Sequence, residues 1–110
     1  MEYSRLGNSA LQVSRICLDF GNCGADEGLL SQGETDQVVQ RAVELGVNFF
    51  ETANYYHHGS SQAYLGTALE RYAEREKVRI ALKLFDEKEG LSRRAIFRGL
   101  EESLRKLHLS

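Results

Sequence analysis

Hydrophobic and polar positions along the chain change their spacing in a regular way. Three short apolar runs, at residues 15–20 (RICLDF), 47–52 (VNFFET) and 78–85 (VRIALKLF), are typical of buried strands. Before them, residues 2–6 and 11–15 flank a Gly-Asn-Ser turn, which favours a short β-hairpin. The chain is therefore predicted to open with a hairpin and to continue with three buried strands.

Each predicted strand is followed by apolar residues at helical spacing. Three helices are expected to begin at the N-cap residues Thr35, Ser61 and Ser92, and Gly46 is expected to end the first. The alternation of strand and helix predicts an α/β fold with a parallel sheet. The residues expected on the buried helix faces are Val38, Val39, Ala42, Val43 and Leu45; Tyr64, Leu65, Ala68, Leu69 and Tyr72; and Ile96, Phe97, Leu100, Leu104 and Leu107.

Composition narrows the class of protein. With 110 residues, 42% hydrophobic and 27% charged, the chain is predicted to form one globular domain. A formal net charge of −2 argues against nucleic acid as a partner, and no apolar run has the length of a membrane span or the form of a signal peptide. Cys17 and Cys23 are too few and too close for a disulfide framework, which favours a reduced, cytoplasmic location. Cys17 is expected to be a buried thiol on the first strand, and Cys23 to lie in a loop without a motif.

Three charged residues recur at one interval. Asp19, Glu51 and Lys83 are each 32 positions apart and stand where a predicted strand gives way to a loop. Equivalent positions of neighbouring parallel strands meet at the carboxyl edge of the sheet, where α/β folds place their chemistry. Glu51 and Lys83 are therefore predicted to be neighbours, with Tyr56 on the loop between them. An ion pair with a purely structural role is the alternative.

Several segments, in order, resemble the N-terminal part of the aldo-keto reductases. RLGNSALQVSRICL resembles the opening hairpin and first strand of that family, and GVNFFETANYYHHGSSQAYLGTALE resembles its signature around an acid-Thr-Ala triplet. VRIALKLF resembles the third strand, which bears a lysine, and LSRRAIFRGLEESLRKLHL resembles the third helix. The resemblance implies the first three βα units of a (β/α)8 barrel (residues 16–46, 47–76 and 77–110) behind a hairpin (1–15). It also implies NADPH as cofactor and a small aldehyde or ketone as substrate.

The same resemblance assigns roles to single residues. Tyr56, five positions after the acid, matches the proton donor; Lys83 matches the lysine beside it, and Glu51 stands at the position of an aspartate. A nearby ammonium favours the ionised phenol, and the carboxylate holds the ammonium in place. Asp19 and Phe20 stand where the family has a Gly-Thr pair near the nicotinamide. Together with Glu51 they are the expected cofactor contacts, and their side chains are expected to crowd the cofactor.

Other features lead to further expectations. His57 and His58 are adjacent and are expected to form an exposed loop pair rather than a metal site. The family's catalytic histidine and phosphate-binding segments would follow Ser110, so the 110-residue chain alone is expected to be inactive. A non-enzymatic interaction module on the same fold and an incomplete gene product are the alternatives. Three strands cannot close a barrel, so free strand edges and an uncovered apolar sheet face predict self-association.

Overall fold

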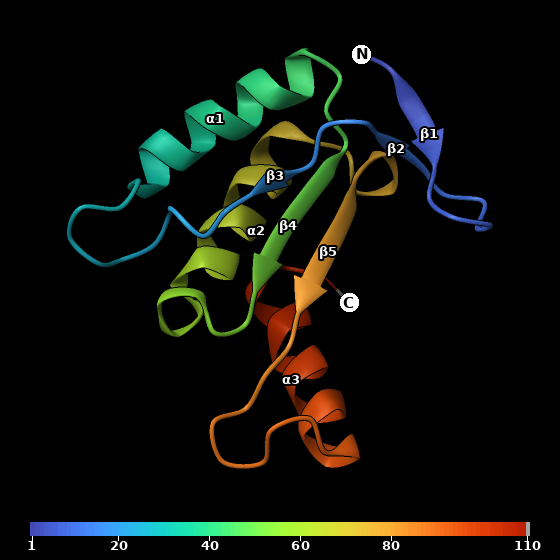
Figure 1. Ribbon diagram of the computed structural model, residues 1–110. Coiled ribbons are helices and arrows are strands. Elements are labelled where there is room, and N and C mark those ends of the chain that lie inside the picture. The colour runs from blue at the N-terminus through green and yellow to red at the C-terminus, as the bar shows by residue number, and fades with distance from the viewer. Residues whose placement is uncertain (110) are drawn as a thin grey trace.

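The computed structural model describes residues 1–109 and contains the predicted hairpin and three strand–helix units (Figure 1). The two short strands of the hairpin pair antiparallel, and the three later strands form one parallel sheet in the order β3-β4-β5. The elements are β1 (Tyr3–Arg5), β2 (Gln12–Ser14), β3 (Leu18–Asp19), α1 (Gln32–Glu44), β4 (Phe49–Ala53), α2 (Ser60–Tyr72), β5 (Arg79–Lys83) and α3 (Arg93–Lys106), with short 3₁₀ helices at Tyr56–Gly59 and Arg75–Lys77. Residues 1–109 thus form an α/β fold whose parallel sheet does not close.

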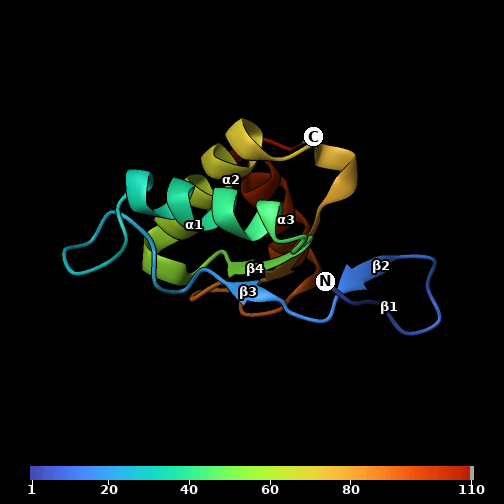
Figure 2. The same ribbon diagram turned by 90° about the horizontal axis from the view of Figure 1, so that it is seen from above.

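All three helices lie on one face of the parallel sheet, and the described residues leave the other face open (Figure 2). The hairpin lies at the amino ends of the strands. It is tied there by a hydrogen bond of 2.6 Å from the Tyr3 hydroxyl to the Gly46 carbonyl, and by one of 2.7 Å from the Ser14 amide to the Asn48 side chain. The carboxyl ends of the strands therefore remain free of the hairpin, and the candidate site lies there.

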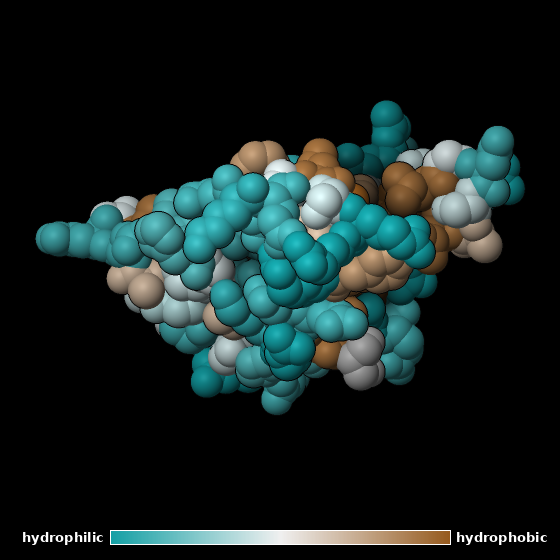
Figure 3. All heavy atoms as spheres, turned by 90° about the horizontal axis from the view of Figure 1, so that it is seen from below, coloured by the Kyte–Doolittle hydropathy of each residue, from teal (hydrophilic) through white to brown (hydrophobic). Residues whose placement is uncertain are grey.

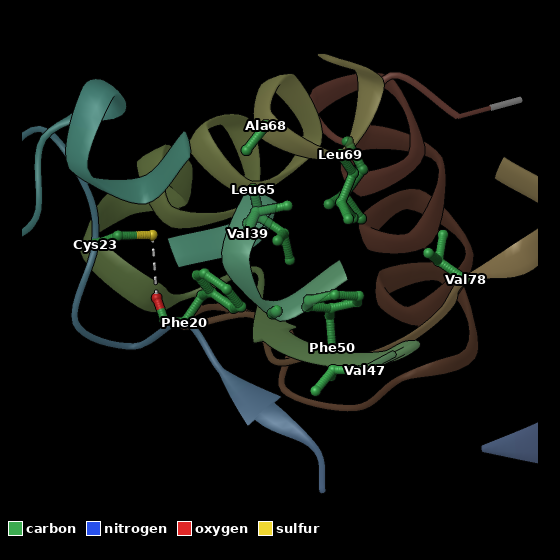
Figure 4. Packing of buried hydrophobic residues seen from close by; sticks show 11 residues of the cluster. Phe20, Cys23, Val39, Val47, Phe50, Leu65, Ala68, Leu69 and Val78 are labelled. Carbon is green, nitrogen blue, oxygen red and sulfur yellow. Dashed lines mark hydrogen bonds between the residues drawn. The ribbon is translucent and has the colours of Figure 1, made fainter. Parts of the chain in front are cut away.

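The hydrophobic core fills the layer between the sheet and the helices (Figure 4). Phe50 on β4, Val39 on α1 and Leu65 on α2 are completely buried in it. The Phe50 ring packs against that of Phe20, with a centroid distance of 6.0 Å. Leu107, which follows α3, closes the same cluster. Burial of such large side chains removes most of their apolar area from water, and this dominates the stability of the fold.

Two of the three predicted helix starts are wrong. Helix α1 is capped by Ser31, not by Thr35: the Ser31 hydroxyl accepts from the Glu34 amide at 3.2 Å, and the Glu34 carboxylate accepts from the Ser31 amide at 3.0 Å. Helix α2 begins one residue before Ser61. The hydroxyl of Ser61 bonds inside the core instead, 2.6 Å from the Phe20 carbonyl. Ser92 does cap α3, as predicted.

The apolar helix faces are less covered than expected. Val38 on α1, Leu45 directly after α1, and Ile96, Phe97 and Leu100 on α3 are all exposed. They lie on the outer flanks of the sheet, beyond the area that the described helices and strands cover. On the open sheet face the carboxyl ends of the strands carry the charged side chains of Asp19, Glu51 and Lys83, and self-association stays a prediction.

The two cysteines have exchanged roles relative to the expectation. Cys17 is exposed, whereas Cys23 is completely buried, with its thiol 3.5 Å from the Phe20 carbonyl. The loop that follows β3 brings the Cys23 thiol beside Ser61 in the first turn of α2, inside the core. Separately, no helix within the described part of the chain combines the length and apolarity needed to cross a membrane.

Candidate active site

A chain of polar contacts crosses the carboxyl edge of the sheet. The Nζ atom of Lys83 lies 3.2 Å from Oε1 of Glu51. The same ammonium donates a hydrogen bond to the Tyr56 hydroxyl oxygen and lies 4.7 Å from the centre of the Tyr56 ring. The Tyr56 hydroxyl donates in turn to Oδ2 of Asp19 at 3.1 Å. The fold thus brings together every candidate residue except Phe20, from three strands and one loop.

The register of the strands differs from the one predicted by the 32-residue interval. Asp19 does lie opposite Glu51, but Lys83 lies opposite Ala53, and Glu51 lies opposite Ala81. The difference is two positions along β5. Because side chains alternate between the faces of a strand, a shift of two keeps Lys83 on the same face as Glu51. The long lysine side chain then reaches the carboxylate diagonally.

Lys83 is the positive centre of this group. The hydrogen bond with Tyr56, and after it the one with Glu51, raises the pKa of Lys83 above its ordinary value. Its side chain is 43% exposed and that of Glu51 is 33% exposed, so the pair is half solvated rather than buried. A charged ammonium bonded to a phenol oxygen can stabilise negative charge as it develops there. The arrangement is therefore suited to proton transfer by Tyr56.

Phe20 takes no part in the site. Its side chain is 2% exposed and lies in the core, and its amide and carbonyl are bonded to Glu51 and Ser61. The expectation that the Phe20 ring crowds a cofactor is wrong. Neighbouring residues of an extended chain point to opposite faces, so Asp19 faces the open side and Phe20 the helices.

The loop that carries Tyr56 has an unusual backbone. His57 and His58 both have positive φ, at 50° and 58°, a conformation that is strained for residues with a side chain. The His57 ring is held 2.6 Å from the carbonyl oxygen of Gly21, and its other nitrogen lies 3.6 Å from Asp26. His57 thus connects its own loop to the loop that follows β3. The sequence predicted an exposed histidine pair and gave no sign of this contact. Within residues 1–109, no group of three or more His, Cys, Asp and Glu side chains is placed to hold a metal ion.

An open groove of about 930 Å³ adjoins the site at the same end of the molecule. Its walls include Asn54, Tyr55 and His57, and the loop between β5 and α3. Asn54 clamps that loop with two hydrogen bonds to the backbone of Phe85, at 3.0 and 3.1 Å. Arg98 of α3 holds the carboxylates of Asp86 and Glu89 in the loop. The view from this end shows mainly hydrophilic side chains (Figure 3), so the groove suits a polar ligand.

Successive strand–helix units with a parallel sheet are the repeating element of a (β/α)8 barrel, and sites of that fold lie at the carboxyl edge of the sheet, where Tyr56 and Lys83 meet. The model of the aldo/keto reductase family matches residues 16–110, and the chain belongs to this family.

Comparison with known proteins agrees with this assignment. The chain is 34% identical to versiconal hemiacetal acetate reductase of Aspergillus parasiticus, over 77% of this chain and 26% of that protein. It is 32% identical to the uncharacterized oxidoreductase YrpG of Bacillus subtilis (strain 168), over 97% of this chain and 36% of that one.

Solved structures show the same fold. The holo form of aldo-keto reductase AKR11C1 from Bacillus halodurans superposes with a TM-score of 0.84 at 26% identity, covering 99% of this chain and 37% of that one. The thermostable aldo-keto reductase Tm1743 superposes with a TM-score of 0.83 at 24% identity, covering 99% and 39%. The chain therefore spans well under half the length of the relatives and structures it matches.

Proposed function

We propose that the chain supplies the proton-donating side of a site that reduces aldehydes or ketones to alcohols with NADPH, or runs the reverse oxidation. The observation that carries this proposal is the hydrogen bond from the Lys83 ammonium to the Tyr56 hydroxyl, with Glu51 on the other side of the same ammonium. Family membership supports it, and the resemblance of the sequence to the family's motifs assigns these roles to Tyr56, Lys83 and, in place of an aspartate, Glu51.

Each residue has a distinct task in this proposal. When bound, NADPH supplies the hydride that adds to the carbonyl carbon. The carbonyl oxygen then takes the hydroxyl proton of Tyr56, so the electron pair left on the Tyr56 oxygen faces the Lys83 ammonium. Glu51 keeps Lys83 charged and pointed at the phenol. The three residues act together, because the tyrosine becomes a useful acid only beside a fixed positive charge.

The residues present fit the reacting end of such a cofactor. The open sheet face next to Tyr56 is uncovered by the described elements, and Asp19 and Glu51 border it with side chains that solvent reaches. Their carboxylates suit the positive charge of an oxidised nicotinamide ring. We propose a small carbonyl compound as substrate and the cytoplasm as location; the free thiols of Cys17 and Cys23 support a reducing compartment.

A fusion experiment tests this function. Residues 1–110 are joined to the part of the Bacillus halodurans reductase that extends beyond the matched region, and NADPH consumption is followed with an aldehyde. We expect turnover in the fusion and none with the 110-residue chain alone, because positioning of both reactants carries much of the rate.

Substitutions in the fusion identify the proton donor. Tyr56→Phe and Lys83→Met should each lower kcat by about 10²–10⁴-fold, the usual contribution of a general acid. Tyr55→Phe removes only the hydroxyl of the neighbouring tyrosine, whose ring centre lies 5.4 Å from that of Tyr56, and should retain activity. Activity that survives Tyr56→Phe but not Tyr55→Phe would contradict the assignment.

A further inference from the structure

The Tyr56 hydroxyl is already fully engaged. A tyrosine hydroxyl has one proton to donate, and Tyr56 gives it to Oδ2 of Asp19 at 3.1 Å. On the acceptor side, the Tyr56 oxygen receives the Lys83 ammonium. A carbonyl substrate that needs the proton of Tyr56 must therefore replace Asp19 as its acceptor.

Asp19 differs from Glu51 in its electrostatic surroundings. The two carboxylates lie opposite each other on adjacent strands, but the ammonium of Lys83 pairs with Glu51. Among residues 1–109, no Lys, Arg or His nitrogen lies within ion-pair distance of Asp19, so the Tyr56 hydroxyl is its hydrogen-bond donor. The Cys17 thiol also reports the negative charge of these two carboxylates. Partial desolvation raises the pKa of Cys17, and the negative charges of Glu51 and Asp19 raise it further.

We propose that Asp19 is a positioning and selectivity residue of this site. Its carboxylate holds the hydroxyl proton of Tyr56 in the free chain and favours carbonyl compounds that carry a hydroxyl or ammonium group on the carbon next to the carbonyl. This inference rests on the proposed function and deepens it, because it names the class of substrate that the Tyr56 site accepts.

The selectivity follows from the hydrogen bond that Asp19 loses when a substrate binds to Tyr56. When a carbonyl oxygen takes the Tyr56 proton, Asp19 loses its donor at a site that the substrate now shields from water. A hydroxyl or ammonium group on the carbon next to the carbonyl can replace that donor, because it lies close to the carbonyl oxygen and can reach Asp19 when that oxygen is bonded to Tyr56. A simple aldehyde or ketone leaves the carboxylate unpaired, and an unpaired acceptor disfavours binding.

The first test detects the hydrogen bond between Asp19 and Tyr56 and needs no catalytic activity. Tyrosines are labelled with ¹³C at Cζ, the Tyr56 signal is assigned with Tyr56→Phe, and the spectrum is followed from about pH 2.5 to 6.5, the range in which carboxylates titrate. We expect a step in the Tyr56 signal that Asp19→Asn abolishes and Glu51→Gln retains. A Tyr56 signal without a step, or a step lost in Glu51→Gln but kept in Asp19→Asn, overturns the proposal. Because this readout needs no reduction, it stands apart from failure of the reductase assay.

The second test uses a matched pair of ketones that differ by one hydroxyl. Hydroxyacetone and acetone are titrated separately into the labelled chain, and the Tyr56 Cζ shift is measured. We expect hydroxyacetone to act at a several-fold lower concentration than acetone in the unmodified chain, and the two ketones to become equal in Asp19→Ala. Equal responses in the unmodified chain, including no response to either ketone, overturn the selectivity.

Discussion

Lys83 lies opposite Ala53 in the parallel register of β4 and β5, and it reaches Glu51 and Tyr56 only along the diagonal. The diagonal reach leaves the lysine side chain 43% exposed. Lys83 is therefore held by hydrogen bonds at the rim of the sheet rather than by burial, and its contribution to stability should depend on pH more than on packing.

The first prediction concerns alkaline stability. The pKa of Lys83 is raised in the folded chain, mainly by Tyr56 and then by Glu51. A raised folded pKa means that the stabilisation is complete below the unfolded value, near 10.4, and is lost as the pH rises through the folded pKa. The urea midpoint of the unmodified chain should therefore fall more steeply above about pH 10.4 than that of Lys83→Met.

Lys77→Met is the matched control for this prediction. Lys77 pairs with Glu74 at 3.1 Å on the surface, with both side chains mostly exposed. Its removal should leave the alkaline slope unchanged. If the urea midpoints of the unmodified chain and Lys83→Met fall with pH in parallel, Lys83 is not held by Tyr56 and Glu51 in solution.

The second prediction concerns the pair that links α1 to α2. Arg71 donates to the carboxylate of Asp36, whose side chain is only 10% exposed and also accepts from Gln32 at 2.9 Å. Arg71→Met leaves a nearly buried carboxylate with a single neutral donor, which should cost about 1–3 kcal/mol of unfolding free energy. Arg41→Met breaks a surface pair with Glu44 and should cost about 0–1 kcal/mol. Urea denaturation at neutral pH compares the two variants. Equal losses of unfolding free energy would mean that water hydrates the Asp36 carboxylate.

The third prediction concerns a close approach between α2 and the end of α3. A Cβ atom at Gly66 would lie 2.6 Å from the backbone of Leu107, so Gly66→Ala must push the two elements apart. Such overpacking should destabilise the fold by about 1–3 kcal/mol.

Gly33→Ala provides the comparison, because Gly33 is also helical and its nearest neighbour to an added Cβ is the Ser31 hydroxyl oxygen at 4.0 Å. That change should be neutral or stabilise by up to about 1 kcal/mol, owing to the better helix propensity of alanine. Thermal unfolding of the Gly66→Ala and Gly33→Ala variants measures the two changes in stability. A stable Gly66→Ala variant would mean that α2 and the end of α3 do not approach so closely.

The fourth prediction concerns self-association, which we expect through the two exposed flanks of the sheet. The first flank, beside β3, contains Ile16, Val38 and Leu45, and an open groove of about 480 Å³ lies there. The second flank, beside β5, contains Ile96, Phe97 and Leu100. Unpaired strand edges with adjoining apolar surface recruit further chains, and head-to-tail contact of unlike flanks continues the parallel sheet.

Two variants test whether the first flank of one chain binds the second flank of another. Val38→Glu blocks the first flank and Phe97→Glu the second, so each variant alone should assemble less than the unmodified chain in light scattering. Mixing them should produce a dimer, because each retains the flank that the other has lost. A monodisperse monomer of the unmodified chain at tens of micromolar, with cooperative unfolding, would show that the flanks do not bind one another.

The local signals of the sequence determined the elements of this protein. The hairpin, the three strands, the end of α1 at Gly46 and the cap of α3 at Ser92 all depend on residues within a few positions of one another. The family motif also marked Tyr56 and Lys83 in advance. The cap at Ser31 was equally local, since Ser31 and Glu34 form a capping box, and it was missed in favour of Thr35.

Tertiary structure alone decided that Asp19 joins Tyr56 and that Lys83 reaches Glu51 along a diagonal. The bond from Lys83 to Tyr56 spans 27 positions and that from Tyr56 to Asp19 spans 37, so neither is visible in local spacing. The shift of two residues between β4 and β5, and the turn of Phe20 into the core, were set by how the strands pack against the helix layer. Periodicity fixes which face a side chain occupies, whereas packing fixes which neighbour it finds there.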